Sequence, residues 1–292
     1  RDSYFEVFPR YWVPQAEVKR RLSAKSWSAQ WLTGWRDITN ATNERTAICA
    51  IAPLRAINNK FPLMFPRVPP RQISGLIANF SAFALDFVAR QKVGGTNLTL
   101  FMLFQLPIFR PDYYTPERQA FVTPRVLELT YTSRSLAPFA RDLRHDGPPF
   151  AWDEDRRALL RAELDAFYAR AYGLTRDELR YILDPADVKG PDYPSETFRV
   201  LKEKEIRKYG EYRTRRLVLE AWDRMEADGT FVDLGLADAV AMPGPPPIQL
   251  PPLEQLPDAA WARSVPSPRH DPSATLAAIL KSLDRPTPIR TF

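Results

Sequence analysis

Cysteine and histidine are scarce in this chain, whose 292 residues include one Cys and two His. Cys49 has no second thiol within the chain for a disulfide or a zinc cluster, and its apolar run, residues 47–52, predicts a core position. His145 lies in RDLRHDGPP beside acidic and turn residues, where a solvated loop is expected rather than a metal ligand. These counts predict no metal site and are compatible with a reducing compartment.

Long apolar runs and a targeting leader are also missing. No window approaches about 18 uninterrupted apolar residues, and no charged and apolar leader follows Arg1. We therefore expect a soluble, cytoplasmic protein without a membrane partner, cut from a longer chain. Apolar residues make up 45% of the sequence, which is enough for the core of one large or two modest domains.

Catalytic motifs are absent as well. The chain has no Walker-type phosphate loop, and two loop histidines support no Ser-His-Asp triad. Adenine methylation requires a glycine-rich cofactor turn and an Asn or Asp before Pro-Pro and an aromatic residue, and neither occurs. Glu17-Val18-Lys19 spells the end of the PD-(D/E)xK nuclease motif, but no Pro-Asp precedes it and a helix is predicted there. We therefore predict no catalytic residues in this chain.

Positive charge is concentrated in the first part of the chain. Residues 1–112 hold 15 Lys and Arg against 7 Asp and Glu, a net charge of +8, whereas residues 113–228 and 229–292 each carry −1. A polyanion such as DNA is the natural partner, because Lys and Arg that neutralise phosphates release counterions. The alternative is a basic surface without a partner.

Polar donors and acceptors crowd into the middle of WRDITNATNERTAICAIAP, residues 35–53. Between positions 40 and 46 they are Asn40, Thr42, Asn43, Glu44, Arg45 and Thr46. One interpretation is a presented recognition element, since Asn and Arg read the edges of adenine and guanine. The other is a turn, because Asn and Thr side chains bond their own backbone. Composition alone favours the turn.

Short strands and one early helix are predicted for residues 1–66. SYFEVFPRYWV alternates bulky and polar residues like a half-buried strand, although its PRYWV end is equally suited to a core or a DNA contact through Arg10, Tyr11 and Trp12. Pro14 opens a helix in PQAEVKRRLSAK. Further strands are expected around Trp31 and over residues 47–52.

A helix, a glycine pair and a strand are predicted next. Apolar residues at helical spacing in residues 70–92 predict one amphipathic helix. Gly94 and Gly95 are expected to end it in the left-handed conformation. The run LTLFMLFQLPIF then predicts a buried strand that ends at Pro107.

Helices dominate the prediction after Tyr113. They are expected from Asp153 to Gly173, over 175–183, over 195–208 with Ser195 as a possible N-cap, and over 213–227. On the first of these, Arg157 to Arg161 and Glu163 are expected to form a solvated face. Beyond Gly229, AMPGPPPIQLPPLEQLPD predicts extended polyproline structure, either a spacer or a strap over the surface, before a short helix over 273–283.

Several long motifs together resemble one protein family. They are PRYWVPQAEVKRRL, WLTGWRDITNATNERTAICAIAP, DFVARQKVGGTNLTLFMLFQLPI, RVLELTYTSRSLAPFARDL, PFAWDEDRRALLRAELDAFYARAYGLTRDELRYIL and KYGEYRTRRLVLEAWD. In order over residues 4–228, they resemble the C-terminal half of large adenine-specific DNA methyltransferases of restriction–modification and phage-defence systems, of the type II-G, DISARM and BREX kinds. Residues 181–195 depart from the pattern, and no role is carried over to them.

The resemblance implies an α+β fold with three parts. Residues 1–112 would be a mixed α+β target-recognition domain, 113–228 a mainly α-helical support domain, and 229–292 a Pro-rich extended tail with a short terminal helix. Catalysis and S-adenosylmethionine would belong to an upstream methyltransferase domain of the same polypeptide, so no cofactor is expected in this chain.

The resemblance also implies a DNA-facing surface. The recognition loop would contain Arg36, Asn40, Thr42, Asn43, Glu44 and Arg45, and a second element would contain Arg90, Lys92, Gly94, Gly95, Thr96 and Asn97. The glycines would allow close backbone approach, and Arg90 and Lys92 would meet phosphates. The expected partners are double-stranded DNA, the upstream domain and other defence-system subunits. The alternatives are a nuclease subunit whose metal site assembles in three dimensions and a protein-interaction module of a defence complex.

Overall fold

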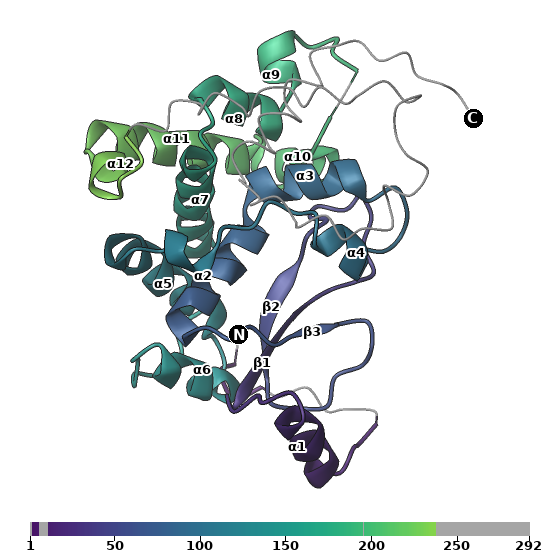
Figure 1. Cartoon of the computed structure of the whole chain (residues 1–292). Helices are drawn as coiled ribbons and strands as arrows, with labels where there is room; N and C mark the ends of the chain where they lie inside the picture. Colours follow the sequence, from purple (N-terminus) through teal and green to yellow (C-terminus); the bar gives the residue numbers. More distant parts are fainter. Residues whose placement is uncertain (1, 6–10, 195, 238–292) are drawn as a thin grey trace, which may run out of the picture.

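A small antiparallel sheet near the N-terminus is followed by a mostly helical region, which confirms the predicted mixed α+β fold class (Figure 1). The computed structural model describes residues 2–5, 11–194 and 196–237. The predicted strap and the predicted helix over 273–283 lie outside these residues. The short helix α1, Gln15–Ser23, follows Pro14 as predicted.

The strand β1, Trp31–Trp35, lies between β2, Cys49–Pro53, and β3, Leu63–Met64, and pairs antiparallel with both. Every residue of β1 is buried. Its two tryptophans also satisfy their ring N–H groups: Trp31 donates to Asp142 at 2.7 Å, and Trp35 donates to the Leu98 carbonyl at 3.0 Å. The predicted strands at these positions are therefore confirmed, and tryptophan anchors the sheet with both its ring and its polar atom.

Gly34 is the one place in β1 where a side chain does not fit. A methyl group there would collide with the Pro62 carbonyl oxygen and with the Phe61 ring. We expect Gly34→Ala to lower the free energy of unfolding by about 1–3 kcal/mol, the usual cost of overpacking. Gly95→Ala is the control, because nothing lies within 4 Å of the added methyl group. Chemical denaturation of both variants tests this, and equal stability of the two would contradict it.

The helix predicted over residues 70–92 is broken in two. α2, Pro70–Ser81, and α3, Phe83–Lys92, are bent by 60° at Ala82, whose backbone is extended. The cause lies far along the chain: the buried carboxylate of Asp165 accepts a hydrogen bond at 2.7 Å from the Phe83 N–H and so caps α3. Asp165 thus stabilises the start of a second helix at Phe83. The local pattern of apolar residues gives no sign of this distant partner.

The glycine pair and the strand predicted after α3 are also corrected. α3 ends at Lys92, the backbone of Val93 after it is extended, and neither Gly94 nor Gly95 is left-handed. The apolar run 98–109 contains the short helix α4, Leu100–Leu103, instead of a strand. Its apolar residues divide between two environments: Leu98, Leu103, Leu106 and Phe109 are buried, whereas Leu100, Phe101 and Phe104 are 52%, 77% and 77% exposed.

The N-terminal strand prediction is wrong for the described residues. Residues 2–5 and 11–13 form no strand, and Tyr11 and Trp12 are exposed rather than part of the core. Arg10 lies outside the part of the chain that the structure describes.

The helical region surrounds α7, Glu154–Ala171, which packs against α3, α5 and α11. The other elements are η1 Pro111–Tyr113, α5 Pro116–Thr130, η2 Arg134–Leu136, α6 Ala137–Asp142, α8 Arg176–Leu183, α9 Ala186–Lys189, α10 Arg199–Tyr209, α11 Arg213–Ala227 and α12 Thr230–Asp233. The helices predicted for α7, α8 and α11 are confirmed; Asp153 caps α7, and Thr175 with Glu178 forms a capping box on α8. α10 begins four residues later than predicted, and Ser195 lies outside the described residues.

One hydrophobic core joins the sheet to the helices. It includes Trp31 and Ile51 of the sheet, Phe80 of α2, Phe167 of α7 and Trp222 of α11. The core therefore continues across residue 112, and the predicted division at that residue stays a prediction. This shared core positions the loop between β1 and β2 against α3 and the helices that follow.

Candidate functional site

The polar stretch between β1 and β2 forms a loop, residues 39–47, that is attached to α3. Asp86 of α3 is fully buried, and its carboxylate accepts hydrogen bonds from the backbone N–H groups of Thr46 at 2.8 Å and Ala47 at 2.5 Å. Because buried carboxylates require such partners, Asp86 fixes the end of the loop to the helix.

Most of the loop's small polar side chains bond within the loop. The Asn40 side chain accepts from the N–H of Thr42 at 2.9 Å and from its hydroxyl at 2.8 Å, an Asx turn. Thr46 donates to the Asn40 carbonyl, Thr39 donates to the Thr46 carbonyl, and Asn43 donates to the Thr39 hydroxyl. The turn interpretation is therefore confirmed, and the DNA-reading role of Asn40, Thr42 and Asn43 stays a prediction.

Arg90 of α3 holds the loop through hydrogen bonds to the loop's backbone carbonyl groups. This corrects its predicted role as a phosphate contact. Its five N–H donors meet Asp86 Oδ2 at 3.1 Å and the carbonyl oxygens of Ala41 (2.6 Å), Thr197 (2.9 Å), Asn43 (2.7 Å) and Glu44 (2.9 Å). A guanidinium has five N–H donors, so none is left for a phosphate. Burial lowers the pKa of Arg90, and attraction to Asp86 opposes this shift. We conclude that Arg90 is a structural clamp.

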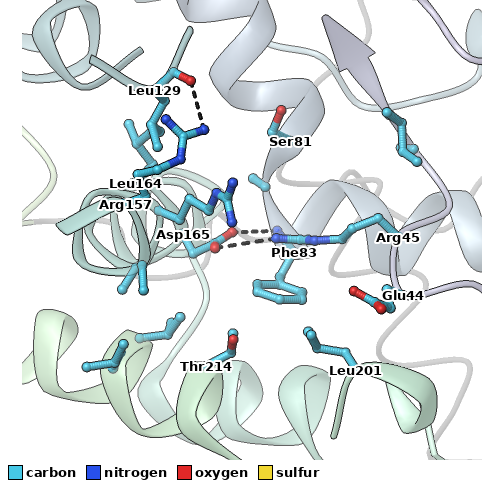
Figure 2. Close-up of a pocket in the computed structure, with 18 of the residues that line it drawn as sticks. Glu44, Arg45, Ser81, Phe83, Leu129, Arg157, Leu164, Asp165, Leu201 and Thr214 are labelled. Atoms are coloured by element: carbon cyan, nitrogen blue, oxygen red, sulfur yellow. Dashed lines mark hydrogen bonds and ion pairs between the residues drawn. The ribbon is translucent and has the colours of Figure 1, made fainter. Parts of the chain in front are cut away.

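Arg45 leaves the loop toward α7 and meets Asp165 (Figure 2). Its guanidinium carbon lies 3.3 Å from the centroid of the Phe83 ring, and its Nη2 lies 3.6 Å from Asp165 Oδ2. Its Nη1 is buried and makes no hydrogen bond with the described residues. Burial raises the pKa of Asp165 from 3.8 to about 6, while Arg45 and the Phe83 N–H act in the opposite direction. A buried carboxylate with a raised pKa at the wall of a cleft is typical of a functional site.

The second predicted element lies beside the first. The Thr96 carbonyl accepts from the Thr39 N–H at 2.9 Å, and Asn97 forms an isolated antiparallel bridge with Ile38. Gly94 and Gly95 are exposed, with open space around their α-carbons. Lys92 is half-buried and donates to Gln105 at 3.2 Å. Thus the fold brings the loop and the 94–97 turn together, whereas Arg90 is buried between the loop and the helices.

A cleft of about 940 Å³ opens between the loop, β2 and the helices α7, α10 and α11. Of the predicted site residues, Arg36, Thr42, Asn43, Glu44 and Arg45 line it. The helices add residues that the sequence did not single out as a site: Glu154, Arg157, Arg161 and Asp165 of α7, Lys204, Glu205 and Lys208 of α10, and Arg213 of α11. Seven Lys and Arg thus face four carboxylates.

The predicted solvated face of α7 is partly wrong. Arg157 is buried, donates to the Leu129 carbonyl at 2.9 Å and lies 3.8 Å from the Trp152 ring centroid. Arg161 is exposed but lines the cleft. Alternating charges on a helix are typical of a solvated face. Nothing in the sequence of α7 therefore indicated that the loop, α10 and α11 would surround this face.

Other kinds of site have little support in the described part of the chain. No group of three or more His, Cys, Asp or Glu residues there could hold a metal ion. Burial raises the pKa of the Cys49 thiol to about 12, so it is not a reactive thiolate at neutral pH. No single described helix is long and apolar enough to cross a membrane; α2 and α3 reach that length only as a bent pair.

Comparison with protein-family models, curated proteins and solved structures found no match to this chain. The methyltransferase resemblance therefore stays a prediction. The charge distribution and the geometry of the loop and cleft are the properties from which a function can be inferred.

Proposed function

We propose that this chain binds double-stranded DNA as the specificity portion of an adenine-specific DNA methyltransferase of a restriction–modification or phage-defence system. The observation that carries the proposal is the net charge of +8 in residues 1–112, the segment in which the loop 39–47 and the turn 94–97 lie side by side. A segment with this net charge attracts the phosphate backbone whatever the base sequence.

Only exposed groups of the predicted site can contact DNA. Arg36, Thr42 and Thr96 are exposed, and Gly94 and Gly95 leave room for a close backbone approach. Arg90 and Asp86 are proposed to act indirectly, by holding the loop in one conformation before DNA arrives. Preorganisation of this kind lowers the entropy cost of binding. Methyl transfer and S-adenosylmethionine are assigned to an upstream domain of the same polypeptide.

Fluorescence anisotropy with a mixed-sequence duplex tests the proposal. The dissociation constant of the full chain is expected to rise steeply between about 50 and 200 mM salt, because each phosphate contact releases counterions. The double variant Arg36→Gln/Lys92→Gln is expected to bind about tenfold more weakly at the lower salt concentration and to lose about two units of salt slope.

Arg141→Gln is the control for this test. It removes one positive charge from the exposed surface of α6, which lies away from α3 in Figure 1, and it should leave affinity nearly unchanged. Absent binding, or binding that does not depend on salt, would contradict the proposal. Equal weakening by Arg141→Gln would show that net charge alone, and not this surface, attracts DNA.

A further inference from the structure

The inner part of the cleft holds two guanidinium groups beside one carboxylate. Arg45 contacts Asp165 with one nitrogen, while its buried Nη1 makes no hydrogen bond with the described residues. Arg161 interacts electrostatically with the same carboxylate, and within the described residues it forms no hydrogen bond or ion pair. Burial and the positive charge of Arg45 both lower the pKa of Arg161, whereas Asp165 and Glu154 oppose this. The two guanidinium groups therefore repel each other in a partly desolvated space.

The other carboxylates of the cleft do not balance the second positive charge of this pair, because they have partners of their own. Lys204 pairs with Glu44 at 2.8 Å, and Lys208 pairs with Glu154 at 2.6 Å. Glu205 accepts two hydrogen bonds from Thr214, at 2.7 Å from its N–H and 2.6 Å from its hydroxyl. The carboxylates of Glu44, Glu154 and Glu205 thus have partners outside this pair, and Asp165 is the carboxylate that acts on both Arg45 and Arg161.

Apolar side chains form a further part of the cleft wall. Ile77, Ala158 and Leu201 are among the residues that line it, and its volume of about 940 Å³ lies within the range of about 300–1,000 Å³ of small-molecule sites. Such a space is too small for a duplex but fits an organic molecule that carries one anionic group. One guanidinium group can donate two parallel hydrogen bonds to two oxygens of a phosphate. Phosphate has enough oxygens for two arginines and is therefore the anion that matches this pair best.

We infer that this cleft binds a small phosphorylated ligand of nucleotide size, with its phosphate between Arg45 and Arg161 and its organic part against the apolar wall. The ligand brings two or more acceptor oxygens, which would accept from the free donors of Arg161 and lie beside the positive charge of Arg45, whose side chain is 24% exposed. Arg36 and Thr42 belong both to the cleft lining and to the proposed DNA-facing surface, but the phosphate is placed on Arg45 and Arg161, so neither proposal depends on the other.

Isothermal titration of the full chain with AMP and, separately, inorganic phosphate tests the site. AMP is expected to bind more tightly than phosphate because only AMP contacts the apolar wall. Arg161→Gln is expected to weaken AMP binding about tenfold or more, the size of a lost charge-assisted hydrogen bond. Arg161 is exposed and makes no internal bond, so this variant should keep the wild-type melting temperature.

Arg207→Gln is the matched control, since Arg207 is exposed on α10 and does not line the cleft. It should bind AMP like the wild type, as should Lys92→Gln, since Lys92 does not line the cleft, while Arg161→Gln should keep duplex binding. No AMP binding at millimolar concentration would overturn the inference. Equal affinity in Arg161→Gln and the wild type, or equal loss in Arg207→Gln, would also overturn it. These results leave the duplex experiment unaffected, so the two proposals can fail separately.

Discussion

Replacing Arg90 with methionine is expected to lower the free energy of unfolding by about 3–5 kcal/mol, the usual cost of breaking a buried ion pair. Methionine has a similar length but no donors, so four carbonyl oxygens lose a partner and the buried Asp86 loses its cation. Urea denaturation followed by tryptophan fluorescence measures the change. Arg90→Lys should lie between methionine and the wild type, because one ammonium group has three donors instead of five.

Arg156→Met is the control for this experiment. Arg156 makes a paired contact with Glu128 at the surface, and exposed ion pairs contribute less than about 1 kcal/mol. Hydrogen exchange gives a second readout: the amides of Thr46 and Ala47, which bond to Asp86, should lose protection in Arg90→Met before the helices do. Equal stability of Arg90→Met and Arg156→Met would show that Arg90 is not the clamp.

Asp165→Asn is expected to change how stability depends on pH. The pKa of Asp165 is raised by burial from 3.8 to about 6, so between these values the folded protein binds more protons than the unfolded chain. Stability from this group is therefore greatest below about pH 4 and falls as the pH rises through 6. Asparagine does not titrate and still accepts from the Phe83 N–H. Relative to the wild type, Asp165→Asn should become more stable by about 2–3 kcal/mol on going from pH 4 to pH 7.

Denaturation of both proteins at several pH values measures this difference. Asp223→Asn provides a control of opposite sign, because Arg176 lowers the pKa of Asp223, and its exposed position makes the effect small. A difference between Asp165→Asn and the wild type that stays constant from pH 4 to pH 7 would contradict a raised pKa. Asp165 also lines the proposed phosphate cleft, so a protonated Asp165 would leave Arg45 and Arg161 without their counter-ion.

Short-range patterns in the sequence predicted many elements correctly. The helices α1, α7, α8 and α11 follow from apolar spacing and from end signals such as Asp153 and Thr175. These features depend on residues three or four positions apart, and they need no partner from a distant segment. The turn in the loop 39–47 was predictable for the same reason, since the Asn40 side chain bonds only two residues ahead.

The errors arose where a distant residue supplies the missing partner. The break between α2 and α3 depends on Asp165, 82 residues after Phe83. The role of Arg90 depends on carbonyl groups as many as 107 residues away. For the apolar run 98–109, hydrophobicity alone did not separate a buried strand from a short helix with one exposed side.

The order of residues alone thus established where positive charge gathers, which segments are helical and which loop is rich in polar groups. Folding determined which of those polar groups remain available to a partner. Arg90 and Arg45 have the same charge, yet all five donors of Arg90 bond to the chain itself, whereas the Arg45 side chain stays 24% exposed beside Asp165. The reason is physical: hydrogen-bond donors are consumed by whichever acceptors the packed chain brings within about 3 Å, and those acceptors come from remote segments.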